Sequence, residues 1–352
     1  MYFRRGRINM AKRKTRGKKI QPSVMKMNFA FTITRTGKES RHIDLSQCAS
    51  LVNRRFYRQG LNWAVAGFKL TTAATAGQIS LHKLPNTWVM SNAWEKSFRT
   101  WQKMNTDALD EVPSIKPKFL DFKIFANADH HENGSGKNLL PHSAATIAAG
   151  IQTAQKGEWE YSKIVVPNTA ANAPGTRINN FEFIAVGPNY PGASSASSLD
   201  AVSLIDGYAA SRGLPNIVDP NAPDDSADAD GATPENWMVA TFNDATGQDD
   251  AVISDMITEN NLSPYPFEND GTNTDTMYPG GANQLNSLEI HDQEFVTTTT
   301  VGGKTYLQGG NFPCGLIEVS TAGFAANDAL LLEVTMVPGT HRGYLAEPMT
   351  EM

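Results

Sequence analysis

The sequence predicts an all-β fold, an antiparallel β-sandwich or jelly roll with long loops and a disordered basic arm at its start. Strand patterns recur at irregular spacing and do not alternate with helices, which argues against an α/β fold. The connections between them are long and rich in Gly, Pro, Asn, Asp and Ser. Residues 1–19 hold nine Lys or Arg and no Asp or Glu, and such a block of like charge does not fold alone.

Alternation of apolar with small or polar side chains marks the strands. In the segment 28–36, NFAFTITRT, the residues Phe29, Phe31 and Ile33 fall on one face, as in a half-buried strand. Further strands are expected at 61–71, 119–126, 158–166, 181–186, 236–242, 315–320 and 329–337. The total is eight or nine, and eight strands in two sheets suit a jelly roll.

Two short helices are expected among the strands. In the segment 92–104, NAWEKSFRTWQKM, apolar side chains recur at intervals of three and four, which is the helical period. Asn92 is placed to cap this helix at its N-terminus. The second helix is expected at 203–211.

The domain organisation follows from the charge and the loops. We expect an arm at residues 1–27 and one domain at 28–352 that carries long surface insertions. Long loops inside a compact domain usually carry function or surface identity. One insertion, 213–303, has seventeen Asp or Glu and no Lys or Arg.

Several classes of protein are disfavoured by composition. Cys48 and Cys314 are the only cysteines, too few for a disulfide framework. Two buried free thiols are expected, and a single bridge stays open. No run of eighteen apolar residues could span a membrane. The basic start is not followed by the apolar stretch of a signal peptide, and Gly6 and Gly17 make it a poor membrane helix, so no membrane partner is expected.

No motif proposes an enzyme, a metal or a cofactor. The segments GSGKN at 134–138 and GGKT at 302–305 lack the Gly spacing or the hydroxyl residue of a phosphate loop and are expected to be turns. His130 and His131 are adjacent, whereas two metal ligands on one face need a spacing of two on a strand or four on a helix. A solvated loop tip is expected there.

An acidic loop leaves a calcium site open. SADADG, residues 226–231, resembles half of a calcium-binding loop, but Trp237 stands where the bidentate Glu is required. Either an exposed acidic loop or a looser site is possible, the latter made by Asp224, Asp225, Asp228 and Asp230.

The basic arm has the composition of a nuclear localisation signal and of a nucleic-acid clamp. Its guanidinium groups can fork onto phosphates while its ammonium groups act as point charges. Tyr2 and Phe3 could stack on unpaired bases. The candidate nucleic-acid-binding positions in the arm are Arg4, Arg5, Arg7, Lys12, Arg13, Lys14, Arg16, Lys18 and Lys19.

A second basic cluster lies at 53–60, NRRFYRQG, where Arg54, Arg55 and Arg58 flank Phe56 and Tyr57. Basic residues interleaved with aromatic ones suit a single-stranded nucleic acid. The alternative is a helix or strand edge with two core aromatics and solvated arginines.

The body and the arm carry opposite charge. Residues 20–352 have 22 basic and 36 acidic side chains, a net charge of −14, against +9 in the arm. Phosphate would repel the acidic stretch 213–303 and attract the arm. A closed shell that is basic inside and acidic outside separates two such faces.

The features that carry a resemblance are the arm, the strand after it, the loop-rich β body and the ending at residues 337–352, VPGTHRGYLAEPMTEM. With these features the chain resembles capsid proteins of circular Rep-encoding single-stranded DNA (CRESS-DNA) viruses, pecovirus-like or smacovirus-like. The resemblance implies one antiparallel eight-stranded jelly roll that self-assembles into an icosahedral shell of about sixty copies. It implies a packaged circular single-stranded DNA genome, contact with the host nuclear import machinery and an unknown host receptor. The protein would be found in the virion and, during assembly, in the host nucleus.

Three alternatives remain open at this point. A jelly-roll capsid protein of a small RNA virus is the nearest alternative, because an arm that neutralises phosphate does not tell DNA from RNA, whereas a nuclear-type signal favours DNA. A nuclear DNA-binding β-sandwich protein would be expected to carry basic residues on its folded body too. A carbohydrate-binding or glycoside-processing β protein would need a placed pair of carboxylates and would have no use for the arm.

Overall fold

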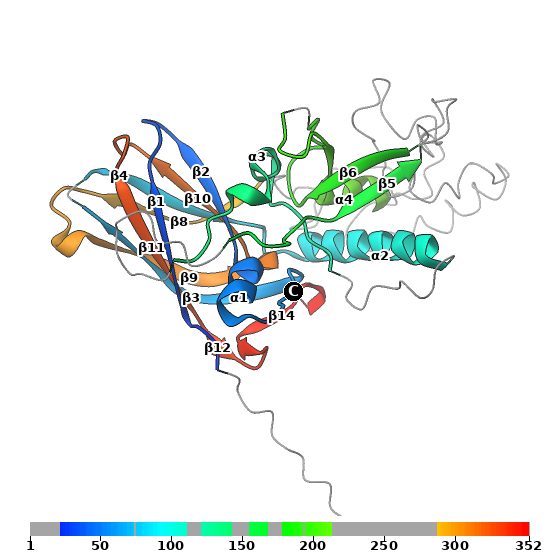
Figure 1. Cartoon of the computed structure of the whole chain (residues 1–352), viewed down its shortest axis with the longest axis horizontal. Helices are drawn as coiled ribbons and strands as arrows, with labels where there is room; N and C mark the ends of the chain where they lie inside the picture. Colours follow the sequence, from blue (N-terminus) through cyan, green and yellow to red (C-terminus); the bar gives the residue numbers. More distant parts are fainter. Residues whose placement is uncertain are drawn as a thin grey trace, which may run out of the picture.

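The computed structural model describes residues 22–73, 75–110, 121–142, 155–167, 178–192, 194–212 and 287–351. It is an all-β sandwich with an inserted unit of helices and a small sheet beside it (Figure 1). The sandwich is built from the two ends of the chain, and the insertion lies between its strands β4 and β8. The prediction of a mostly β fold is confirmed.

The first sheet of the sandwich has the order β1-β11-β3, and β9 pairs with the other edge of β3. All its pairs are antiparallel. A short strand, β14 (Ala346–Pro348), pairs with the start of β3. The four long strands are β1 (Lys26–Thr32), β3 (Leu61–Thr72), β9 (Lys304–Phe312) and β11 (Ala329–Met336).

The second sheet has the order β2-β10-β4-β8 and is also antiparallel throughout. Its strands are β2 (Glu39–Asp44), β4 (Gly77–Lys83), β8 (Glu289–Val296) and β10 (Leu316–Ala322). A two-stranded hairpin, β12 (Pro338–Gly339) with β13 (Gly343–Tyr344), follows β11 near the start of the described chain.

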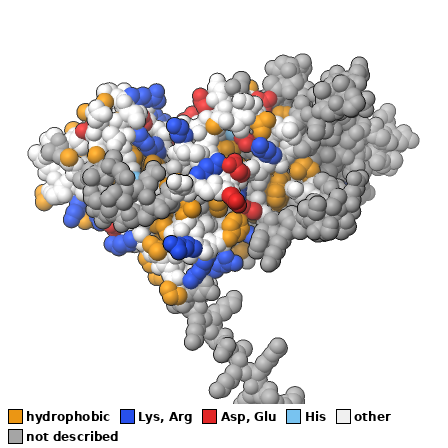
Figure 2. All heavy atoms as spheres, viewed as in Figure 1, with side chains coloured by type: hydrophobic (Ala, Val, Ile, Leu, Met, Phe, Trp, Pro, Cys, Tyr) orange, Lys and Arg blue, Asp and Glu red, His pale blue; other side chains and the backbone are white. Residues whose placement is uncertain are grey.

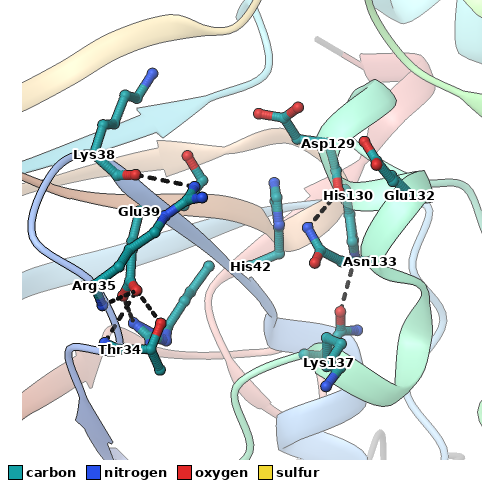
Figure 3. Close-up of a pocket in the computed structure, with 13 residues that line it drawn as sticks. Thr34, Arg35, Lys38, Glu39, His42, Asp129, His130, Glu132, Asn133 and Lys137 are labelled. Carbon is teal, nitrogen blue, oxygen red and sulfur yellow. Dashed lines mark hydrogen bonds and ion pairs between the residues drawn. The ribbon is translucent and has the colours of Figure 1, made fainter. Parts of the chain in front are cut away.

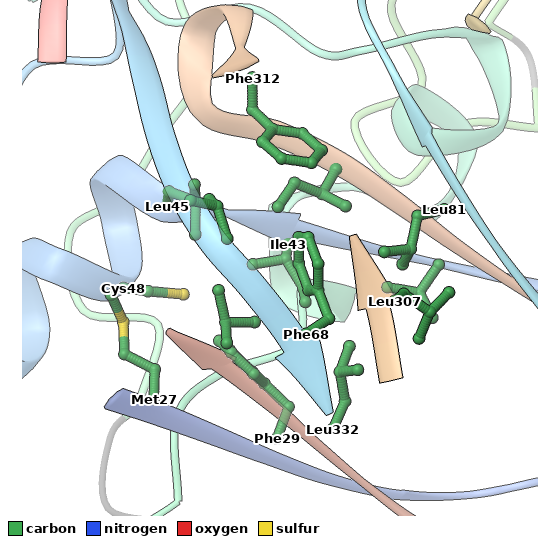
Figure 4. Packing of buried hydrophobic residues seen from close by; sticks show 14 of the residues in the cluster. Met27, Phe29, Ile43, Leu45, Cys48, Phe68, Leu81, Leu307, Phe312 and Leu332 are labelled. Atoms are coloured by element: carbon green, nitrogen blue, oxygen red, sulfur yellow. The ribbon is translucent and has the colours of Figure 1, made fainter. Parts of the chain in front are cut away.

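The inner faces of the two sheets form one hydrophobic core (Figure 4). Phe29 of β1 lies opposite Leu332 of β11 in the register, and both side chains are fully buried. Ile43 and Leu81 approach from the second sheet. Burial of large apolar side chains is the main favourable term in such a fold. The alternation read in 28–36 therefore identified a face of the core.

Helix α1 (Leu45–Asn53) closes one end of the sandwich. Asp44 caps it, since its carboxylate accepts hydrogen bonds from the backbone N–H groups of Ser46 and Gln47 at 2.9 and 3.2 Å. Cys48 lies on the buried side of this helix, and Cys314 is also buried. Both thiols are free, as expected.

The insertion has its own hydrophobic cluster, around Trp94, Phe122, Phe183 and Leu204. It contains helices and a small sheet in which β5 and β6 are antiparallel and β6 and β7 parallel. Its elements are α2 (Trp88–Asp110), α3 (Ala128–Asn133), β5 (Lys163–Pro167), β6 (Ile178–Ile184), β7 (Asp200–Ser203) and α4 (Leu204–Arg212).

The two expected helices are present as α2 and α4, but α2 has 23 residues and is not short, and the helices α1 and α3 were not expected. The prediction that Asn92 is the N-cap is wrong, because α2 begins four residues earlier. The hydroxyl of Thr87 accepts a hydrogen bond from the backbone N–H of Met90 at that end. None of the helices in the described part of the chain is long and apolar enough to span a lipid bilayer.

The strand expected at 119–126 is not formed in its described part, 121–126, where Phe125 makes only an isolated bridge to Ile184. The apolar side chains of this segment pack into the insertion core instead of a sheet face. Four strands of the sandwich were missed, namely β2, β4, β8 and β9. Their outer faces and edges are polar, so few apolar residues mark them. The strand expected at 236–242 lies outside the described residues.

Candidate nucleic-acid interface

The described chain begins against the end of α1. The guanidinium of Arg55 donates to the carbonyl oxygen of Pro22 at 3.2 Å. The N–H of Val24 donates to the side-chain oxygen of Asn53 at 2.9 Å, and the hydroxyl of Tyr344 donates to the carbonyl of Val24 at 2.6 Å. The basic positions Arg4 to Lys19 lie outside the described residues, but the chain joins the body at this fixed point.

Of the predicted cluster Arg54, Arg55 and Arg58, only Arg55 contacts that point, whereas the carbonyl of Arg58 is bound by Ser46 at the other end of α1. Arg54 follows α1 as its C-cap in the left-handed conformation, with φ of 52°. This turn ends the helix and leaves the Arg54 and Arg58 side chains exposed. The structure therefore places Arg54 and Arg58 on the surface and Arg55 against the start of the described chain.

The two aromatic residues of the cluster separate. Tyr57 is buried against Trp63 and Tyr344, with ring centroids 5.8 and 5.6 Å away. Phe56 is 37% exposed. One aromatic side chain thus belongs to the core and the other to the surface, so the alternative with two core aromatics holds for Tyr57 and not for Phe56.

The sequence interpretation missed two basic residues near this cluster: Arg342, which is exposed, and Lys123, which is buried and paired with Asp121. The guanidinium of Arg342 donates to the carbonyl oxygen of Phe56, and Arg342 is exposed. The ammonium of Lys123 lies 5.8 Å from the Phe56 ring centroid and 4.3 Å from that of Trp159, within the range of a cation–π contact. No local motif marks either residue, because both reach the cluster through the tertiary fold.

Figure 2 shows Lys and Arg side chains gathered at the end of the sandwich where the described chain begins. Next to them is a pocket of about 500 Å³. It is lined by Phe56, Arg58, Gly60, Leu61, Trp94, Phe98, Phe122, His341 and Arg342. Exposed cations beside aromatic side chains form a surface that suits phosphates and unpaired bases.

A second hollow, of about 740 Å³, lies between the turn after β1, strand β2 and helix α3 (Figure 3). Its lining mixes both charges, with Arg35, Lys38 and Lys137 against Asp129 and Glu132. Because positive and negative side chains are mixed, the electrostatic potential in this hollow has no single sign, so the hollow favours neither phosphates nor cations.

The carboxylate of Glu39 in this hollow is bound by groups of the neighbouring turn. It accepts hydrogen bonds from the backbone N–H groups of Thr34 and Arg35 at 3.0 and 2.9 Å and pairs with Arg41 at 3.0 Å. Burial would raise the pKa of Glu39, but the bond from Thr34 and the charge of Arg41 outweigh it, so the pKa is lowered. Its role is to hold the β1–β2 connection.

The expectation that His130 and His131 form a solvated loop tip is wrong. They lie on α3 and both are fully buried. His131 Nε2 lies 2.9 Å from a carboxylate oxygen of Glu182. Asn127 caps α3, accepting from the N–H of His130 at 2.9 Å. This cap turns the helix so that both rings face the interior instead of solvent.

His130 is held as a neutral ring. Its Nδ1 accepts a hydrogen bond from the N–H of Ala126 at 3.1 Å, so its proton sits on Nε2, 2.8 Å from the side-chain oxygen of Asn138. The ring stacks on His42 with centroids 4.3 Å apart. Burial and the neighbouring His42 hold the pKa of His130 well below its ordinary value of 6.5.

Glu318 links the stacked ring of His42 to His82. Its two carboxylate oxygens lie 3.5 Å from His42 Nε2 and 3.4 Å from His82 Nδ1. Burial would raise the pKa of Glu318, but the bonds from the two histidines outweigh it and hold the pKa well below its usual range. In the part of the chain that the structure describes, no group of three or more His, Cys, Asp or Glu could hold a metal ion.

The remaining predicted sites are partly described. In the segment 302–305 the expected turn is formed only by Gly302 and Gly303, which have positive φ, whereas Lys304 and Thr305 begin strand β9. The segment 134–138 forms a short 3-10 turn after α3. The candidate calcium ligands Asp224, Asp225, Asp228 and Asp230 lie outside the described residues.

No family model, no curated protein and no solved structure matches the chain.

Proposed function

We propose that this chain is a viral capsid protein that self-assembles into a small icosahedral shell and packages circular single-stranded DNA through its basic arm. The shell would contain about sixty copies, related by closed symmetry. The cargo would lie against the arm and the cluster Arg54, Arg55 and Arg58. The protein would act without catalysis and without a cofactor.

The strand order supports the finer proposal that the sandwich is a jelly roll. Taken in chain order, the eight long sandwich strands are β1, β2, β3, β4, β8, β9, β10 and β11. One sheet holds the first, eighth, third and sixth of them, and the other holds the second, seventh, fourth and fifth. This interleaving of early with late strands is that of two Greek keys wrapped into a double sheet.

The observation that carries the proposal is where the arm meets the body. The carbonyl oxygen of Pro22 is bound by Arg55, which follows the exposed Arg54 in the sequence, so the chain that carries the nine charges of residues 1–19 joins the body at a basic segment of the fold. One face of the subunit therefore attracts phosphate. Neutralising phosphates with Lys and Arg releases counterions and needs no base sequence, which suits a packaging protein.

The charge of the stretch 213–303, which runs from the end of the insertion through strand β8, supports the opposite orientation, away from the nucleic acid. The stretch 213–303 has no Lys or Arg, and phosphate would repel it. We place it on the exterior of the shell, where it could contact a host receptor. Before assembly the host nuclear import machinery would also bind the arm, so the protein would occur in the host nucleus and in the virion.

Electron microscopy of the purified, nuclease-treated full-length protein tests this function. The ultraviolet absorbance of the same fraction reports nucleic acid. Uniform closed particles with the absorbance ratio of a nucleoprotein are expected. Extracted cargo should be digested by DNase and not by RNase. RNase-sensitive cargo would favour the capsid of a small RNA virus. A soluble monomer that never forms particles when single-stranded DNA is added would contradict the proposal and favour a nuclear DNA-binding protein.

A further inference from the structure

The pocket beside the arm junction has a wall of stacked aromatic rings. Trp94 and Phe98 of α2 stack with centroids 5.2 Å apart and planes 14° apart. Phe122 lies edge-on to Trp94 at 6.0 Å and 5.8 Å from Phe98. On the other side Phe56 is 37% exposed. These rings bring flat apolar faces to an opening in the basic surface.

The opening is cationic. Arg58 and Arg342 both line the pocket and are both exposed. None of the described residues that line it is acidic. The remaining polar lining group is the ring of His341, whose pKa is lowered by burial and by the charge of Arg342. A ligand that joins an anion to a flat apolar group therefore fits this pocket, because the arginines attract the anion and the aromatic rings stack on the flat group.

Trp94 adds an unused hydrogen-bond donor. Its side chain is 7% exposed, and its indole N–H has no partner within the described residues. A buried donor without an acceptor costs stability. Because the N–H bond lies in the plane of the indole, an acceptor would have to approach the edge of the Trp94 ring, while a stacked group would contact its face.

We infer that this aromatic pocket binds one unpaired base of a nucleic-acid strand, with the flanking phosphates on Arg58 and Arg342. The inference rests on the proposed function and adds a preference to it. A base can enter only if it is unstacked and unpaired, so the pocket selects single strands over duplex, whereas the arm binds both. Packaging of a single-stranded genome would then be favoured by the folded body as well as by charge.

Binding of the full-length protein to three fluorescent probes of equal length tests the inference. The probes are oligothymidylate, an abasic strand with the same phosphates, and a duplex. The variants are Phe56→Ser and Phe98→Leu, and Phe295→Ser is the matched control because Phe295 is 68% exposed on β8 and does not line the pocket. Base stacking on one aromatic ring changes affinity by about tenfold.

We expect both pocket variants to bind oligothymidylate about tenfold more weakly while their affinity for the abasic strand and the duplex stays that of the unaltered protein. The Phe295→Ser control should bind all three probes normally. Unchanged oligothymidylate affinity in both pocket variants would overturn the inference and leave the proposed function intact. Equal weakening for the abasic strand would also overturn it, because the effect would not come from the base. No binding of any probe by the unaltered protein would refute the proposed function itself.

Discussion

The carboxylate of Asp44 accepts a hydrogen bond from the indole Nε1 of Trp159 at 3.1 Å. Both residues are buried, and they lie 115 positions apart in the chain. The same oxygen accepts from the side chain of Gln59 at 3.0 Å, while the other oxygen caps α1. One carboxylate therefore fixes the helix beside the arm junction to the sandwich and to the insertion.

Replacing Asp44 with Ala should destabilise the fold strongly. The change removes the helix cap and leaves the donors of Gln59 and Trp159 buried without acceptors. A lost cap costs about 1 kcal/mol and each unsatisfied buried donor about 1–3 kcal/mol, so we expect a loss of about 3–7 kcal/mol. Urea unfolding of the unassembled protein measures it. Asp44→Asn keeps one acceptor oxygen and should lose less, and equal losses in the two variants would contradict this account.

The titration of Asp44 predicts a pH dependence of stability. Burial raises its pKa from 3.8 to about 6, against the effect of its hydrogen bonds. The folded state therefore holds the proton more tightly than the unfolded state. The resulting stabilisation is complete below about pH 4 and is lost as the pH rises through about 6. Relative to Asp44→Asn, the unaltered protein should gain about 3 kcal/mol on going from pH 7 to pH 4. A difference that does not vary with pH would refute the assignment.

The titration of His130 should change stability with pH in the direction opposite to that of Asp44. Its folded pKa lies well below 6.5, so below that pH only the unfolded state takes up the proton. Stability contributed by the neutral ring is present above pH 6.5 and is lost as the pH falls, by about 1.4 kcal/mol per pH unit for one proton. His130→Gln should remove this slope between pH 6.5 and 5, as measured by chemical unfolding at each pH. A variant with the slope of the unaltered protein would show that other groups cause it.

Gly60 should be intolerant of a side chain because of Trp94. A Cβ atom at position 60 would collide with the six-membered ring of the indole, whereas one at Gly136 would meet no atom within 4 Å. Gly60→Ala should cost about 1–3 kcal/mol, the usual range for overpacking. Gly136→Ala is the matched control and should leave the unfolding midpoint nearly unchanged. Similar midpoints for the two variants would mean that Trp94 moves aside freely.

Deleting residues 1–19 should remove nucleic acid from the particles and leave shell formation intact, since the deleted charges neutralise phosphate. Absorbance and electron microscopy of the purified truncated protein measure the two properties. A variant with nineteen uncharged residues in place of the arm controls for length. Truncated particles that still carry nuclease-resistant nucleic acid would contradict the role of the arm.

Local pattern predicted some elements well. The alternation of Phe29, Phe31 and Ile33 and the helical spacing around Trp94 and Phe98 each reflect one buried face, which sequence periodicity reports directly. β8 illustrates the failures: Glu289–Val296 is largely exposed, and it is a strand because it pairs with β4. Pairing with a distant partner leaves no period in the sequence of the edge strand.

Some residues of the candidate site could likewise be predicted from the sequence, and others could not. Composition alone identified the basic arm and the cluster Arg54, Arg55 and Arg58, because charge density needs no fold to be recognised. Only the tertiary structure brought Arg342 and the α2 aromatics to that cluster and buried His130 and His131. The physical reason is that charge and period are properties of a local segment, whereas burial and proximity depend on which distant segments pack together.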